Sequence, residues 1–508
     1  MKIVNIMNFV RTFEPRNTAL EDKMVEVTRN QLRLINEMGL QATFLLEYDA
    51  LTDERYLEIF REEAGENIEL GLWYEVVEPL TTDIGIEYRS KMGYRWDWNI
   101  EPGYSMSYDN PTKERLIDRA MKTFREVFGY YPRTVGSWVI ETHTLNYLSE
   151  HYDVDALCIC RDQINTDAYT MIGGYFNGLY MPSRKNIFTP ARTEEYQVNI
   201  PVIRLLGPDP IHNYDGTKHL SERRAGISTN GLAEPTCTVY TLEPACAAGS
   251  DPVAVDWFFS TFLDAEHLSH GYVQLGQENS FAAFDIIEPL RMQFEKVKKR
   301  DDLMVMKMGD TGRMFREKFG KTQPSAVTAL RNWDDADCQS VCYSSSRYTV
   351  NVFRHDGVVA LRYLYLFDER IEDFYLKNRC TTLDSLHENL PIIDTYTQRL
   401  GGDGGAGLIL STDARELFVR SVDGVSLEVS WQDGSATLFE DRIIITNCKA
   451  MFTPEMFKTH ISLTDTSIEY EYKGHRYSLV IHGGVSSFDG ETFYITGDEV
   501  TLVPTPGN

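Results

Sequence analysis

The first part of the chain alternates short apolar runs with longer amphipathic stretches, and this alternation limits the fold more than any other feature of the sequence. Apolar runs of strand length cover residues 2–9, 42–46 and 67–73. Between the first two runs, residues 21–38 carry apolar side chains at helical spacing, and Gly39 supplies a helix stop. A strand, a helix and a second strand in this order predict parallel strands joined by helical crossovers.

The same alternation continues as far as Asp310. Further strands are expected over residues 133–140, 154–160, 200–206, 271–276 and 303–308. Further helices are expected over residues 53–64, 112–128, 144–151 and 252–267. Seven or eight strand–helix units predict an α/β fold, a distorted (β/α)7 or (β/α)8 barrel, over residues 1–320.

The hydrophobic pattern changes near residues 322–325. Beyond this point apolar and polar residues alternate with a period of two, which is typical of strands with one buried face. Turn-forming Asp-Gly pairs, such as those at 423–424 and 433–434, separate the strands. We therefore expect a second domain over residues 325–508, a mostly antiparallel β-sandwich.

The chain is strongly acidic, with a formal net charge of −26 over 508 residues. This charge disfavours nucleic acids and anionic membranes as partners, because both would face a field of like sign, and a neutral or cationic substrate fits better. Residues 1–20 carry charged side chains in place of an apolar signal core, so we expect a cytoplasmic protein. Secretion of a longer precursor and assembly into a homo-oligomer stay open.

The eight cysteines are few for a chain of this length. Cys158 and Cys160 share one face of a predicted strand, and no second close pair accompanies them with the spacing of a zinc site. We expect ordinary reduced thiols.

Three segments of the predicted barrel carry a recognisable set of residues. They are Thr12-Phe13-Glu14-Pro15, Ala42-Thr43-Phe44-Leu45 and Glu69-Leu70-Gly71-Leu72-Trp73. These segments resemble strand ends of the polysaccharide deacetylase (NodB-like) barrel superfamily and, more broadly, its relatives in glycoside hydrolase families thirty-eight and fifty-seven. The deacetylases hold a metal ion with an aspartate and two histidines. In this chain Trp73 falls near the first expected histidine, and the first histidine is His143, so we expect no metal cofactor.

In a parallel barrel the residues just beyond the carboxyl ends of the strands converge on one rim, where the chemistry takes place. The residues at these positions are Arg11, Glu14, Glu47, Asp49, Trp73, Glu75, Glu78, Trp138, Glu141, Arg161, Asp162, Asp209, His212, Asp215, Gln277, Glu278, Asn279 and Asp310. Carboxylates and aromatic rings dominate this set. Glycosidic bond cleavage needs two carboxyl groups, and sugar rings stack on aromatic side chains, so the rim predicts a glycoside hydrolase.

Three glutamates are the candidate catalytic residues: Glu141, Glu278 and Glu75. In the similar fold of family fifty-seven a nucleophilic glutamate follows the fourth strand and an acid follows the seventh, which implies these roles for Glu141 and Glu278. A glutamate at a helix start is also a common N-cap, so capping by Glu141 stays open. Glu278 is either a general acid with a pKa raised by apolar neighbours or a buried residue bonded to a loop. Glu75, beside Trp73, is a candidate acid or sugar ligand.

The other rim residues are candidate substrate-binding groups: Glu14, Trp73, Trp138, Arg161, Asp162, Asp209, His212, Gln277 and Asn279. Asp209 and His212 follow a Gly-Pro-Asp-Pro sequence, and turn formation explains them better than a metal half-site. Arg161 and Asp162 either pair with each other or leave Arg161 to hold a substrate anion.

We therefore expect a metal-independent glycoside hydrolase that acts on a polysaccharide or glycan by a two-carboxylate mechanism, without a cofactor. A carbohydrate de-esterase, a polysaccharide lyase and a non-catalytic sugar-binding protein are the alternatives. The sequence leaves the sugar, the linkage and the stereochemical outcome open.

Overall fold

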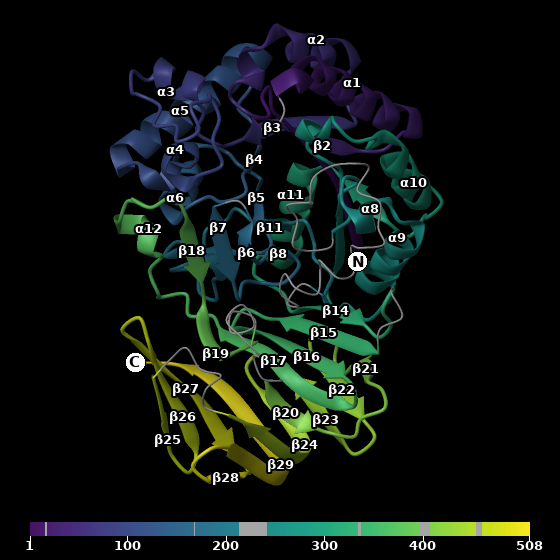
Figure 1. The fold of residues 1–508 in the computed structure, drawn as a ribbon, viewed down its shortest axis with the longest axis vertical. Coiled ribbons are helices and arrows are strands. Elements are labelled where there is room, and N and C mark those ends of the chain that lie inside the picture. Colours follow the sequence, from purple (N-terminus) through teal and green to yellow (C-terminus); the bar gives the residue numbers. More distant parts are fainter. Residues whose placement is uncertain are drawn as a thin grey trace.

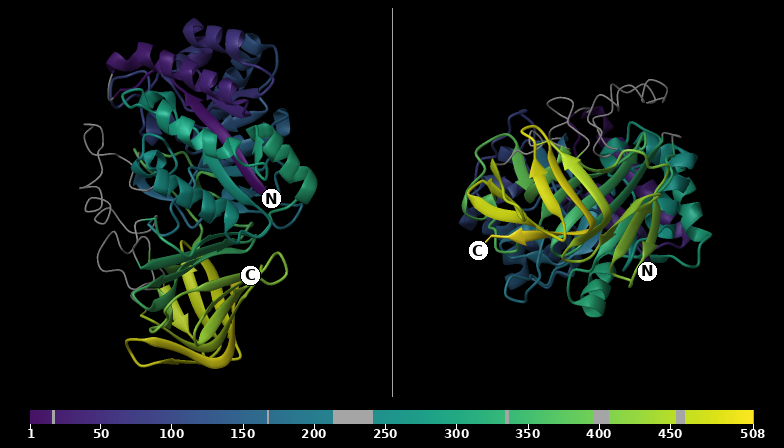
Figure 2. Two further views of the ribbon diagram at one scale, coloured as in Figure 1. Left: turned by 90° about the vertical axis from the view of Figure 1, so that its right-hand side faces the viewer. Right: turned by 90° about the horizontal axis from the view of Figure 1, so that it is seen from below.

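The computed structural model describes residues 1–15, 18–166, 168–212, 241–333, 337–395, 407–453 and 460–507. The chain forms two parts stacked along the long axis of the molecule, an N-terminal part of helices and strands and a C-terminal part of strands (Figures 1 and 2). The predicted rim residue Asp215 lies outside the described residues. Within the described ranges, no helix is both long and apolar enough to cross a membrane.

A curled, mostly parallel sheet forms the centre of the N-terminal part. Its strands run in the order β12-β1-β2-β3-β4-β5-β11-β8, and every neighbouring pair is parallel except β11 and β8. A further strand, β13, pairs in parallel with the beginning of β1. The bounds are β1 Lys2–Val10, β2 Ala42–Leu46, β3 Ile68–Trp73, β4 Thr134–Gly136, β5 Ala156–Cys160, β8 Gly178–Tyr180, β11 Val202–Leu205, β12 Gly271–Leu275 and β13 Met304–Met306. The predicted α/β barrel class is confirmed, in an open form.

Helices cover the outside of this sheet (Figure 1). Their bounds are α1 Glu21–Met38, α2 Glu54–Glu63, α3 Glu78–Asp83, α4 Ile100–Gly103, α5 Asn110–Phe128, α6 Thr142–His151, α8 Ala247–Ser250, α9 Pro252–Phe259, α10 Ile287–Lys298 and α11 Met308–Phe319. Helix α1 has the predicted bounds because its apolar stripe, including Leu32 and Ile35, is buried and Gly39 ends it at a φ of 68°. That left-handed conformation favours a residue without a side chain.

The C-terminal part is one 15-stranded sheet in which all paired strands are antiparallel. The bounds are β14 Ser325–Ala329, β15 Cys338–Ser344, β16 Tyr348–His355, β17 Val358–Leu366, β19 Leu390–Asp394, β20 Leu408–Ser411, β21 Phe418–Ser421, β22 Leu427–Trp431, β23 Gly434–Leu438, β24 Ile443–Phe452, β25 His460–Leu463, β26 Ser467–Tyr472, β27 His475–His482, β28 Val485–Phe488 and β29 Phe493–Pro506. The predicted antiparallel character of this region is confirmed.

Strands β15 to β17 form a wall shared by the two parts. Alternate side chains such as Cys342 and Phe353 join the hydrophobic core of the barrel. Their neighbours Val341 and Val352 join the core of the antiparallel sheet. Both faces of these strands are therefore buried, and buried polar residues such as Ser340, Asn351 and Arg362 lie among the apolar ones.

One segment of the C-terminal part returns to the barrel, a feature that the sequence did not predict. Strand β18 (Ser385–Glu388) pairs in parallel with β7 (Tyr169–Ile172), beside β6 (Gln163–Thr166). The short helix α12 (Phe374–Lys377) precedes it, and β9 (Pro182–Ser183) and β10 (Asn186–Pro190) form a separate hairpin. The Cys380 amide donates to Met106 O at 2.8 Å, so this return also reaches the loop before α5.

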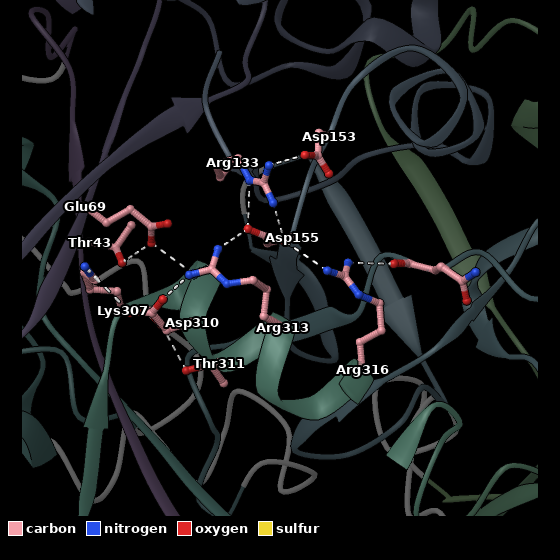
Figure 3. A network of polar contacts seen from close by, with 12 residues as sticks. Thr43, Glu69, Arg133, Asp153, Asp155, Lys307, Asp310, Thr311, Arg313 and Arg316 are labelled. Carbon is pink, nitrogen blue, oxygen red and sulfur yellow. Dashed lines mark hydrogen bonds and ion pairs between the residues drawn. The ribbon is translucent and has the colours of Figure 1, made fainter. Parts of the chain in front are cut away.

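A buried ion-pair network lies at the amino-terminal edge of the parallel strands (Figure 3). Asp155, just before β5, accepts from Arg133 Nε at 2.9 Å and from Arg316 Nη2 at 3.1 Å, and also pairs with Arg313. Arg313 and Arg316 belong to α11, which approaches so closely that a Cβ on Gly312 would lie 2.2 Å from Asp155 O. This edge is opposite the rim that carries chemistry, so the network serves stability.

Candidate active site

Four charged residues from neighbouring strand ends meet at the carboxyl edge of the parallel sheet. Arg11 follows β1, Glu47 follows β2, Glu75 follows β3 and Glu278 follows β12. The strand order places β12, β1, β2 and β3 side by side. All four residues are buried, with exposed fractions of 0% to 3%. Buried charges are costly, so their partners decide what the cluster can do.

Arg11 is the cation at the centre of this cluster, which we call the Arg11 cluster. Its Nη2 atom lies 3.3 Å from Glu75 Oε1 and 3.4 Å from Glu278 Oε2. Its guanidinium also stacks on Trp96, 4.4 Å from the ring centroid. Burial lowers the pKa of Arg11, but the carboxylates of Glu278 and Glu75 more than offset this and leave the pKa well above its ordinary value. Glu14 adds to the same field.

Glu75 is held by two indoles as well as by Arg11. Trp73 Nε1 donates to its Oε1 atom at 3.0 Å, and Trp96 Nε1 donates to its Oε2 atom at 2.6 Å. Trp73 stacks on Phe9 at 4.2 Å and meets Trp138 edge-on at 5.1 Å. Trp96 comes from the segment between α3 and α4. The aromatic side chains therefore orient a carboxylate.

Glu47 and Asp49 form an acidic pair next to these residues. Burial raises the pKa of Glu47 well above its ordinary value, and Asp49 and Glu75 raise it further, while Arg11 opposes the shift. Burial also raises the pKa of Asp49, although Thr12 donates a hydrogen bond to it. No donor among the described residues reaches either Glu47 oxygen. The raised pKa therefore favours the protonated form of this buried carboxyl.

Asn279 and Gln277 tie the cluster to the scaffold. Asn279 accepts from Arg11 N at 2.9 Å and donates to Arg11 O at 2.9 Å, which fixes the loop after β12 to the loop after β1. Gln277 Nε2 donates to Glu243 at 3.2 Å. Both predicted substrate-binding residues thus act on protein groups. Ser280 Oγ donates to Glu278 Oε1 at 2.5 Å, whereas Glu278 Oε2 has the Arg11 ion pair and accepts no hydrogen bond from the described residues.

Glu141 lies at the start of α6 and caps that helix. Its carboxylate accepts from Thr144 N at 3.2 Å, from Ser105 Oγ at 2.9 Å and from Thr144 Oγ1 at 2.5 Å. Lys113 Nζ lies 3.7 Å from the same group. This is the capping arrangement that the sequence left open, and no described contact joins Glu141 to Arg11.

The predicted binding groups after β5 and β11 bond to protein groups on other elements or in their own loops. Asp162 accepts from Arg204 Nη2 at 2.7 Å and from Gly173 N at 2.7 Å, so its ion pair among the described contacts is with Arg204 of β11. Asp209 accepts from Ile211 N at 2.8 Å, as the turn interpretation predicts. The side chains of His212 and Asn332 are hydrogen-bonded to each other. The side chain of Arg161 is buried.

The predicted rim residues thus fall into two groups, those in or beside the Arg11 cluster and those that bond elsewhere. Six of the predicted residues lie in or beside the Arg11 cluster: Glu14, Trp73, Glu75, Trp138, Glu278 and Asn279. The sequence placed Arg11, Glu47 and Asp49 on the rim but gave them no role, and it missed Glu243. A basic residue directly after a strand, among so many acids, is the signal that could have singled out Arg11.

The metal ion of the deacetylases does not fit this rim. Among the described residues, no group of three His, Cys, Asp or Glu side chains is arranged to hold a metal ion. Trp73, near the place of the first histidine, uses its ring nitrogen to donate to Glu75. An indole N–H is a donor and cannot ligate a cation.

The sequence matches no protein-family model and none of the curated proteins. Among solved structures, one described as a "putative glycoside hydrolase/deacetylase" from Parabacteroides distasonis is similar over 77% of this chain and 90% of its own, with a TM-score of 0.53 and 13% identity. At this identity the likeness shows the fold alone, and it confirms the barrel that the sequence resembles.

Two further structures are less similar. A "putative polysaccharide deacetylase" from Mycobacterium smegmatis matches 62% of this chain and 91% of its own, with a TM-score of 0.38 and 16% identity. A GH57-type branching enzyme from Pyrococcus horikoshii matches 62% of this chain and 70% of its own, with a TM-score of 0.37 and 8% identity. These two scores are too low to carry an argument.

Proposed function

We propose that this chain is a carbohydrate-active hydrolase that cleaves glycosidic bonds, and that the Arg11 cluster is its catalytic site. The observation that supports this most is the pair of unlike carboxyl groups in one buried cluster. Burial and the neighbouring carboxylates raise the pKa of Glu47, which favours its protonated form, whereas Glu278 is paired with a cation. A glycosidase needs one carboxyl as acid and a second as nucleophile or base, and unlike environments separate those roles.

In this mechanism Glu47 gives its proton to the glycosidic oxygen as the bond from that oxygen to C1 breaks. Glu278 Oε2 has an ion pair with Arg11 at 3.4 Å and no hydrogen bond from the described residues. This oxygen either forms a bond to C1 or takes a proton from the water that attacks C1. The sequence named Glu141, Glu278 and Glu75 as catalytic; we keep Glu278, leave Glu141 as a helix cap and add Glu47 as the acid.

Arg11 and Glu75 position the reacting groups. Arg11 holds Glu278 from one side and Glu75 from the other, and the indole N–H groups of Trp73 and Trp96 fix Glu75 in turn. The net charge of −26 favours a neutral glycan as substrate. The fold shared with a structure described as a glycoside hydrolase/deacetylase also supports a carbohydrate substrate.

The test is a screen of oligosaccharides and polysaccharides with chromatographic detection of the products. On any glycan that is cleaved, Glu278→Gln and Glu47→Gln should each lower kcat by about 10² to 10⁴, since each removes one carboxyl function and keeps the shape. Glu141→Gln, the same substitution in the helix cap, is the control and should keep kcat within a few-fold. A loss of activity in Glu141→Gln that exceeds the loss in Glu278→Gln would move the site to Glu141.

A further inference from the structure

A cavity of about 350 Å³ lies between the barrel and the antiparallel sheet, apart from the Arg11 cluster. One side comes from the N-terminal part, with Arg192 after β10 and Lys321 after α11. The other side comes from two turns of the C-terminal part. Arg347 lies between β15 and β16, and Arg442 follows the turn between β23 and β24. The volume suits a ligand of monosaccharide size.

The lining carries an excess of positive charge in a chain whose net charge is −26. Four cationic side chains face two carboxylates, Glu440 and Asp441. Asp441 is already paired with Arg442 at 2.8 Å. Lys321 and Arg347 form no ion pair with any described residue. Their charges therefore remain available to an anion from outside the protein.

Arg192 is the most buried of the four cations, with 19% of its side chain exposed. Its nearest carboxylates are Glu369 at 3.7 Å and Asp368 at 4.0 Å, and its Nε atom has no hydrogen-bond partner among the described residues. Glu369 is itself occupied, because it accepts from Arg192 N at 2.6 Å. Burial lowers the pKa of Arg192, and although Glu369 opposes this, the nearby Arg347 adds to it. Arg347 is thus close enough to Arg192 to disfavour its charge.

Hydrogen bonds hold the turns that present these groups. Tyr348 OH donates to Phe439 O at 2.5 Å and to Arg442 O at 3.1 Å, which holds the turn between β23 and β24 against β16. Ser346 Oγ donates to Glu440 Oε1 at 2.9 Å, which draws that carboxylate to one side. A preorganised set of donors loses little freedom on binding.

We propose that this cavity binds a phosphate group, free or on a small organic molecule of sugar size. A phosphate carries more charge than a carboxylate and so matches more of the unpaired cations, and arginine forks bind its oxygens in pairs. The site lies at the junction of the two parts and is independent of the proposed hydrolase activity.

Isothermal titration calorimetry of the full chain at low salt tests this site with inorganic phosphate, glucose 6-phosphate and glucose. We expect saturable binding of at least one phosphate-bearing probe at millimolar or lower concentration and no binding of glucose. If inorganic phosphate binds as well as glucose 6-phosphate, the ligand is a free anion. If glucose 6-phosphate binds more tightly, the ligand is an organic phosphate. Equal binding of glucose and glucose 6-phosphate, or no heat with either phosphate probe, would overturn the proposal.

Two arginine variants locate the binding. Arg347→Ala should weaken phosphate binding about tenfold or more, since it removes a charge-assisted contact. Arg420→Ala is the matched control, because this exposed arginine of the same sheet pairs only with Glu428 and is not part of the cavity. Equal phosphate affinity of the two variants, with unchanged thermal melts, would contradict the site. Glycan cleavage, measured separately, should be the same in both variants.

Discussion

The acidic pair in the Arg11 cluster makes a specific prediction about stability, which is that Glu47→Gln stabilises the protein at neutral pH. The folded-state pKa of Glu47 is raised well above its ordinary value of 4.5 by burial and by Asp49 and Glu75. A group of this kind contributes stability that is fully present below the unfolded pKa and is lost as the pH rises through the folded pKa. Glutamine resembles the protonated acid and does not titrate, so the variant escapes this loss.

The magnitude follows from one proton. Between the unfolded and folded pKa values, the free energy of unfolding of the wild type falls relative to the variant by about 1.4 kcal/mol per pH unit. The variant should therefore gain on the wild type with each pH unit above the unfolded pKa, until the pH reaches the folded pKa. Asp49 raises the pKa of Glu47 further, so the slope belongs to the pair.

Urea unfolding followed by tryptophan fluorescence measures this difference at each pH, because five of the seven tryptophans, 73, 96, 98, 138 and 257, precede the antiparallel sheet. Glu141→Gln is the control of opposite sign. It replaces a carboxylate that accepts from Ser105 and Thr144 and should cost about 1–3 kcal/mol. A stability difference between Glu47→Gln and the wild type that does not change with pH would refute the raised pKa of Glu47.

Three further predictions concern charge and metal. Arg11→Met should lower the free energy of unfolding by about 3–5 kcal/mol, because it leaves buried carboxylates without a cation. Adding Glu278→Gln should recover part of that loss. A double variant no more stable than Arg11→Met would contradict the pairing. Asp155→Asn should cost about 3–5 kcal/mol at neutral pH. Burial raises the pKa of Asp155, but Arg133 and its neighbours lower it by more. The stabilisation by Asp155 therefore exists above the unfolded pKa and is lost as the pH falls through the folded pKa. Thermal melts in which wild type and variant lose stability equally in acid would contradict this. EDTA should change neither activity nor the melting temperature, and a melt lowered by EDTA would reveal a metal.

The sequence predicted the parallel barrel well because each of its strands is a short apolar run that ends at a recognisable stop. Helix α1 agrees residue for residue, since Gly39 marks its end. Strand β4 is shorter than predicted, because the chain leaves the sheet at Ser137 and carries the apolar residues up to Ile140 onto the rim. The return of β18 to β7 had no local signal, as it joins segments more than 200 residues apart.

The sequence placed the rim residues but not their contacts. Rim residues follow from strand ends, so Glu75 and Glu278 could be named. Their shared cation, Arg11, depends on strand β12 lying next to β1, and these two strands come from opposite ends of the barrel sequence. The same local pattern, a glutamate before a helix, suits a catalytic residue and an N-cap, and only the contacts of Glu141 with Thr144 and Ser105 favour the cap.

The central claim is that the Arg11 cluster cleaves glycosidic bonds with Glu47 as the acid. The most direct measurement is the pH dependence of kcat/KM on a cleaved glycan for the wild type and Glu47→Gln, with a second substrate whose leaving group needs no protonation. We predict that Glu47→Gln loses the basic limb of the profile and about 10² to 10⁴ in rate on the glycan, but retains most of the rate on the activated substrate. Equal losses on both substrates, or an unchanged profile, would contradict the assignment.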